Sequence, residues 1–191
     1  MTPPPILRTE RLTLREIVAA DAPFVLEMVN DPGFIANIGD RGVRTEADAA
    51  RHIAEKYTGH YARHGYGIYL VERDGRPIGT CGLVRRDGLP GPDLGYAFLS
   101  AHVGQGYGRE AGEAVLRHAR AVLGMDTILA FIKPDNAASA ALLARLGFVP
   151  AGEVTLPGYP GTSLLFRHAS PDRPNPLVGA PSLPPQESAR S

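Results

Sequence analysis

The chain has 191 residues, a formal net charge of zero and 43% hydrophobic residues, which suits one domain of ordinary size with an apolar core. The neutral balance gives no reason to expect attraction to nucleic acid or to an anionic membrane, and no apolar stretch approaches the ~18 residues of a membrane span. The single cysteine, Cys81, fits a reducing compartment and the N-terminus has no signal-peptide pattern, so we expect a soluble cytoplasmic protein.

The first part of the chain predicts a strand followed by a helix. Residues 1–8 form a proline-rich lead-in, and the alternation over residues 11–17 predicts a half-buried strand. We expect Asp21 to cap a helix over residues 22–29, with a proline in its tolerated first turn. Residues 34–44 are predicted to form a loop.

A second helix and a hairpin follow. Residues 45–48 (TEAD) resemble a capping box that opens a helix, and this helix fades near His64 and Gly65. Residues 67–72 and 77–84 read as strands, and Asp74-Gly75 between them is a strong hairpin signal.

The second half predicts a strand over residues 94–99, a helix to about Leu123, and an apolar strand over residues 127–132. A helix that joins two such strands favours a right-handed crossover and makes them parallel neighbours. Asp135 or Asn136 is expected to cap the next helix. The remaining predicted elements are that helix over residues 137–145, a strand from Phe148 and a returning strand over residues 163–167. We predict one domain over residues 1–169 and a disordered proline- and serine-rich tail over residues 170–191.

Three glycines at alternate positions, Gly104, Gly106 and Gly108, stand between the strand over residues 94–99 and the helix that follows. Glycine permits positive φ and close approach of a ligand, and the first N–H groups of a helix attract anions. By itself the pattern fits a flexible turn equally well. The dinucleotide fingerprint and the Walker loop both require other spacings or residues. We therefore interpret the stretch as a cradle for a diphosphate.

In its order of motifs the chain resembles the GNAT acetyltransferases, in particular the branch that acetylates ribosomal proteins and small amines. The likeness covers roughly residues 6–168 and depends on four pieces: residues 9–15 (TERLTLR), the Gly95-Tyr96 strand leading into residues 104–111 (GQGYGREA), residues 136–139 (NAAS) and residues 146–148 (LGF). The resemblance implies an α/β fold with a central mixed sheet of six to seven strands and four flanking helices. It also implies that strands 94–99 and 127–132 splay apart.

The resemblance implies that acetyl-CoA is the co-substrate, with its pyrophosphate in the cradle, its pantetheine arm along residues 98–99 and its thioester in the gap. The cofactor-binding residues carried over by position are Phe98, Leu99, Val103, Gly104, Gln105, Gly106, Tyr107, Gly108, Arg109, Asn136 and Ser139.

Two positions depart from the family pattern. Val103 stands where an Arg or Gln is usual, and Leu143 stands where many relatives have a tyrosine that protonates the leaving thiolate. The resemblance implies Ser139 as the substitute, with a hydroxyl that hydrogen bonds the thiolate as charge develops. Asp93 is our first candidate for the group that takes the proton from the amine, and Glu72 and Asp40 are the next candidates.

The acceptor side is assigned by the same resemblance. We expect Asn37, Asp40 and Arg41 to form one wall, where Asp40 suits a cationic amine and Arg41 a carboxylate, and Tyr159 to close the other side. The predicted function is N-acetylation of a primary amine, such as a protein N-terminus, an amino acid or a small amine; the alternative is a non-catalytic acyl-CoA sensor. We predict no metal site, because no histidine has metal-ligand spacing, and no nucleic-acid or membrane partner. The chain is expected to be a monomer or a homodimer.

Overall fold

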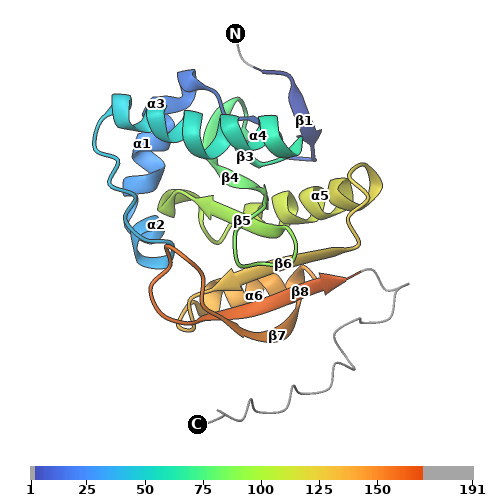
Figure 1. Cartoon of the computed structure of the whole chain (residues 1–191). Helices are drawn as coiled ribbons and strands as arrows, with labels where there is room; N and C mark the ends of the chain where they lie inside the picture. The colour runs from blue at the N-terminus through green and yellow to red at the C-terminus, as the bar shows by residue number, and fades with distance from the viewer. Residues whose placement is uncertain (1–2, 170–191) are drawn as a thin grey trace, which may run out of the picture.

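A computed structural model describes residues 3–169, so the tail predicted to be disordered, residues 170–191, lies outside the described residues. One mixed sheet of eight strands forms the centre, in the order β1-β2-β3-β4-β5-β6-β8-β7 (Figure 1). The strands are β1 Pro5–Arg8, β2 Thr13–Glu16, β3 Ile68–Arg73, β4 Arg76–Val84, β5 Asp93–Phe98, β6 Thr127–Ile132, β7 Val149–Val154 and β8 Ser163–Ala169.

Helices cover both faces of this sheet. The helices are α1 Ala22–Asn30, α2 Pro32–Asn37, α3 Glu46–Ile53, α4 Gly59–His64, α5 Tyr107–Ala121 and α6 Ala137–Arg145. A π-helical turn, Ala54–Thr58, joins α3 to α4 without a break. One core cluster packs α5 and α6 on the sheet through Val115, Leu143 and their neighbours, and another packs α1 and α3 on the opposite face through Val25 and Ile53.

The mixed α/β class and the divergence of the two central strands are confirmed. β5 and β6 run parallel, joined by the crossover helix α5, and they pair at Asp93 and Leu129 alone among the described residues. Beyond that pair the strands separate. The predicted helix over residues 137–145 matches α6, and Asn136 caps it by accepting a hydrogen bond from the Ser139 amide at 3.0 Å.

Other local predictions are also confirmed. Thr45 and Asp48 form the reciprocal capping box at the start of α3. Asp74 and Gly75 both have positive φ, at 50° and 74°, which is the backbone of a tight hairpin turn between β3 and β4.

Three predictions about the first fifty residues were wrong. Residues 5–8 are the edge strand β1, not a lead-in, which brings the sheet to eight strands where six or seven were expected. Proline is tolerated on a sheet edge, because one side of such a strand needs no ladder hydrogen bonds. Part of the predicted loop over residues 34–44 belongs to helix α2, whose N-terminus is capped by Asp31 through the Gly33 amide at 2.8 Å.

Asp21 does not cap α1 with its side chain. Its carboxylate instead accepts two hydrogen bonds from the Arg15 guanidinium, at 2.9 and 2.8 Å. Arg15 also donates to Glu72 at 2.9 Å and is 5% exposed. A buried guanidinium requires such partners, and this demand outweighs the local capping preference of Asp21.

Candidate active site

The bend before α5 has the geometry of an anion cradle. Gly104 and Gly106 have φ values of +81° and +83°, which side-chain-bearing residues rarely adopt. Residues 103–106 are exposed, and no atom of the described residues lies within 4 Å of a Cβ built on Gly104. The helix begins at Tyr107, so its first amides point out of the helix without intrahelical partners. The bend is therefore open at Gly104, whereas Arg11 Nη2 lies 3.4 Å from a Cβ built on Gly106.

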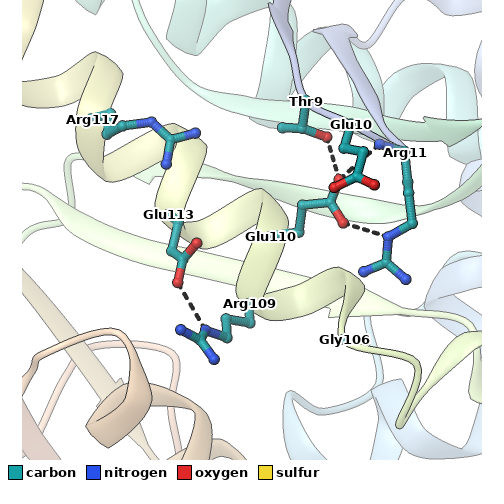
Figure 2. Close-up of a pocket in the computed structure, with 8 residues that line it drawn as sticks. All are labelled: Thr9, Glu10, Arg11, Gly106, Arg109, Glu110, Glu113 and Arg117. Atoms are coloured by element: carbon teal, nitrogen blue, oxygen red, sulfur yellow. Dashed lines mark hydrogen bonds and ion pairs between the residues drawn. The ribbon is translucent and has the colours of Figure 1, made fainter.

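A strap, formed by residues 9–12 in the β1–β2 turn, contacts the first turn of α5 next to this bend (Figure 2). Glu110, in the first turn of α5, accepts hydrogen bonds from the Thr9 hydroxyl at 2.6 Å, the Arg11 amide at 2.9 Å and Arg11 Nε at 2.7 Å. Arg11 Nη1 donates to the Gln105 carbonyl at 3.1 Å, and its guanidinium lies 4.7 Å from the centre of the Tyr107 ring. Burial raises the pKa of Glu110, but the hydrogen bonds from Thr9 and Arg11 outweigh it and lower that pKa.

The strap borders a surface pocket of about 630 Å³ that runs from Gly106 along α5 to Arg117 (Figure 2). Within it Arg109 pairs with Glu113 at 2.8 Å. A second pocket occupies the gap between β5 and β6, and the two linings share Gly106 and Arg109.

That gap leaves one edge of β5 open. The Leu99 amide donates to the Ile78 carbonyl at 3.1 Å, and the Leu99 carbonyl accepts from the His102 amide at 2.8 Å. Alternate residues of a strand turn their backbone groups to opposite edges, so the groups of Tyr96 and Phe98 face the gap. Leu99, predicted to pair with a pantetheine arm, has both of its backbone groups occupied within the protein.

A groove of about 1200 Å³ runs through the gap and is lined from both faces of the sheet. Most of the predicted site residues line it: Asn37, Arg41, Asp93, Phe98, Val103, Gly104, Gly106, Tyr107, Gly108, Arg109, Asn136, Ser139 and Tyr159. Leu99, Gln105 and Asp40 are not among the lining residues. The Tyr107 side chain is 2% exposed and its hydroxyl accepts from Arg73, so only its backbone is available to a ligand.

Ser139 and Tyr96 meet across the gap. The Tyr96 hydroxyl donates to the Ser139 carbonyl at 3.5 Å, and burial raises the pKa of Tyr96 to about 12. Leu143, at the position where a tyrosine was noted as missing, is fully buried in the core. Tyr96 was not among the predicted site residues. Its alternation with Phe98 in the predicted strand was the available signal, because residues two apart share a face and an edge.

Asp93 lies at the point where β5 and β6 diverge. It is 1% exposed, and its two carboxylate oxygens accept from Arg86 Nε at 2.9 and 3.1 Å. Burial raises the pKa of Asp93 to about 6, although the positive charge of Arg86 opposes the shift. A carboxyl group that titrates there can take up a proton near neutral pH.

The other two candidate bases are engaged elsewhere. Glu72 accepts from Arg15 on β2, and neither Glu72 nor Asp40 lines the groove. Asp40 is bound by the Arg44 guanidinium, whose hydrogen bonds lower the pKa of Asp40 to about 2, and it also accepts from the Gly42 amide at 2.8 Å. Of these three candidates Asp93 is the one that lines the groove, where it is paired with Arg86.

Comparisons with known proteins identify the family. A model of the acetyltransferase (GNAT) domain matches residues 11–149. The chain belongs to the GNAT acetyltransferase family. It is therefore an acetyl-CoA-dependent N-acetyltransferase.

Individual relatives agree with this assignment. The chain is 29% identical over 150 residues to an uncharacterized N-acetyltransferase, p20, of Bacillus licheniformis, covering 76% of this chain and 83% of that protein. An acetyltransferase structure from Agrobacterium tumefaciens superposes with a TM-score of 0.73 at 26% identity, covering 89% and 96% of the two chains. The fold is also similar to RimL, a ribosomal L7/L12 α-N-protein acetyltransferase solved in complex with coenzyme A, with a TM-score of 0.75 at 18% identity over 87% and 98%.

The residues of this acetyltransferase fit the coenzyme of its family. The cradle offers outward-pointing amides in an open bend, and the free edge of β5 offers backbone groups to an extended amide chain. Within residues 3–169 no cluster of three or more metal-ligating side chains occurs, and none of the described helices is long and apolar enough to cross a bilayer.

Substituting Gly104→Glu in this acetyltransferase is expected to weaken acetyl-CoA binding by at least about 100-fold, because a carboxylate enters the seat of the diphosphate. Gly124→Glu is the matched control, since Gly124 also has positive φ (+64°) and nothing within 4 Å of its Cβ position. Titration calorimetry measures both affinities. Equal acetyl-CoA affinity of the two variants would remove the cradle from the coenzyme site.

Proposed function

We propose that this acetyltransferase moves an acetyl group to a primary amine by direct attack within the gap between β5 and β6. The observation that carries the proposal is the groove itself, which connects the glycine cradle on one side of the gap with the buried Asp93 on the other. A direct transfer needs both reactants in one continuous space, and this groove provides that space.

The roles of the coenzyme-side residues follow from their placement. The amides of residues 104–108 bind the diphosphate, and the backbone of Tyr96 and Phe98 pairs with the amide-bearing arm. Asn136 fixes the first turn of α6 through the Ser139 amide at 3.0 Å, and this orients Ser139 toward the groove. Acetyl-CoA, when bound, supplies the acetyl group as an activated thioester.

Ser139 and Asp93 take the two proton-handling roles. The Ser139 hydroxyl donates a hydrogen bond to the sulfur as negative charge develops there. Asp93, directly or through one water, takes the proton that the amine must lose. Arg86 keeps the Asp93 carboxylate oriented and limits the rise of its pKa.

The function is tested by a thiol-release assay with acetyl-CoA and a panel of primary amines that includes amino acids, N-terminal peptides, polyamines and aminoglycosides. We expect thiol release that depends on the amine and matches the amount of acetylated amine found by mass spectrometry. Tight acetyl-CoA binding without thiol release on any amine would contradict the proposal.

The pH dependence tests Asp93. Because the base form of Asp93 is the deprotonated one and its pKa is raised to about 6, kcat/KM is expected to fall as the pH drops through about 6. This acidic limb should keep its position when acceptors of different amine pKa are compared. Asp93→Asn is expected to lower kcat/KM by about 100-fold or more and to abolish the limb.

Asp87→Asn is the control, since Asp87 also lines the groove and the substitution is chemically identical. It should retain the wild-type profile. An Asp93→Asn variant that keeps a wild-type pH profile, with its fold checked by circular dichroism, would exclude Asp93 as the base.

A further inference from the structure

The groove has a charge that the chain as a whole does not have. The sequence holds 20 basic and 20 acidic residues, whereas the groove lining holds eight arginines and lysines against three carboxylates. Arg109 on α5 and Arg145 on α6 suit a phosphorylated coenzyme, whereas the Lys133 ammonium group donates to the Ala36 carbonyl of α2. The excess at the other end requires a separate explanation. That end contains Arg41, Lys56, Arg63, Arg85 and Arg86 against Glu55, Asp87 and Asp93.

Arg41 is the cation at this end with the clearest geometry. Its guanidinium lies 5.4 Å from the centre of the Tyr159 ring, and its Nη2 donates to the Tyr159 hydroxyl at 3.4 Å. No carboxylate within residues 3–169 lies within ion-pair distance of Arg41. The adjacent carboxylate of Asp40 is bound by Arg44. Arg41 therefore presents a positioned positive charge without a counter-ion from the described chain.

Arg86 contacts the same tyrosine but differs in its charge balance. It donates to the Tyr159 hydroxyl at 2.6 Å, and its guanidinium lies 5.5 Å from the ring centre. Its charge is balanced by Asp93. The Tyr159 ring is fixed in turn by an edge contact with Phe131, at 4.9 Å between ring centres. Tyr159 thus holds one guanidinium that serves the proposed base and a second, Arg41, that is available to a ligand.

The π-helical turn beside Arg41 contributes one carboxylate, Glu55, and one ammonium group, Lys56, so it adds no net negative charge to the groove. The π-helical turn Ala54–Thr58 carries Tyr57, which packs edge-on against His52 at 5.6 Å between ring centres. Burial raises the pKa of Tyr57 to about 12, so its hydroxyl stays neutral. Burial, together with the charges of Arg41 and Lys56, lowers the pKa of His52, although the charge of Glu55 opposes the shift. Insertions of this helical type are frequent at functional sites.

We propose that the acceptor is a small amine that carries a carboxylate close to its amino group, as a free amino acid does, and that Arg41 binds this carboxylate. The proposal rests on the proposed function. A planar guanidinium matches a carboxylate with two parallel hydrogen bonds, which is a strong and directional contact. Asp93 lies in the same groove and accepts the amine proton. Polycationic amines meet an uncompensated positive charge here and are rejected.

The experiment compares matched acceptors. With the full chain and acetyl-CoA, we measure kcat/KM for the common L-amino acids and for their carboxamides. Spermidine and kanamycin represent polycationic acceptors, and a C-terminally amidated peptide represents protein acceptors. The best free amino acid is expected to exceed its carboxamide by at least about tenfold. Amidation lowers the pKa of the amine, so a larger fraction of the carboxamide is unprotonated at neutral pH. The protonation state of the amine therefore cannot produce a preference for the free acid.

Variants then assign the preference to Arg41. Arg41→Gln is expected to reduce the acid-to-amide ratio to near one while the KM for acetyl-CoA stays unchanged, which also reports an intact fold. Arg41→Lys should retain part of the ratio. Arg51→Gln removes the same charge from an exposed arginine on α3 that pairs with Asp48 outside the groove, and it should keep the wild-type ratio.

The outcomes separate the two proposals. Turnover of carboxamides, the amidated peptide or polycations at rates equal to or above those of free amino acids would overturn the carboxylate proposal and leave amine acetylation standing. An unchanged ratio in a folded Arg41→Gln variant would do the same. Absence of turnover with every amine would overturn the proposed function itself.

Discussion

β5 and β6 pair in parallel through Asp93 and Leu129, and then they separate. A continuous ladder between these strands would occupy the backbone groups of Tyr96 and Phe98 and would close the groove. The ladder stops after one residue pair, and three features follow from this. The edge of β5 is open, a passage connects the two faces of the sheet, and Asp93 lies at the point of divergence. The rest of the site is arranged around this opening.

The two ends of the groove are held by different kinds of interaction. At the cradle the groups proposed to bind the coenzyme are backbone amides, and the β1–β2 turn contacts this segment through Arg11 and Glu110. At the other end the groups are side chains linked in a chain from Asp93 through Arg86 and Tyr159 to Arg41. Backbone donors suit an invariant diphosphate, whereas side chains allow the acceptor preference to differ between members of a family.

The parts of the fold that could be predicted are those with short-range signals. The capping box at Thr45, the Asp74-Gly75 hairpin and helix α6 each depend on residues a few positions apart, and all three are confirmed. Strand β1 and the role of Asp21 depend instead on the tertiary surroundings, although β1 pairs with β2 and Asp21 pairs with Arg15 over short sequence distances. Pro5 is acceptable in a strand only because the strand is at the sheet edge, and Asp21 turns to Arg15 because that guanidinium is buried.

The site shows the same division. Positive φ at Gly104 and Gly106 could be predicted from residue type and position before a helix. Three other features could not be predicted: the hydrogen bonds of the Leu99 backbone, the pairing of Asp40 with Arg44 and the contact of Tyr96 with Ser139. Each requires knowing which strand edge or loop faces the residue. Arg41 and Tyr159 are 118 positions apart in sequence, and only the folded β7–β8 loop brings them together.

The central claim, that the backbone of the cradle and the open edge of β5 bind the coenzyme, is tested most directly by amide NMR on the ¹⁵N-labelled full chain titrated with acetyl-CoA. We predict that the largest chemical-shift changes fall on the amides of residues 104–108 and on those of Tyr96 and Phe98, with Leu99 less affected because its amide is already bonded to Ile78. Shifts concentrated instead around Arg117 on the outer side of α5, with residues 104–108 unchanged, would contradict this account.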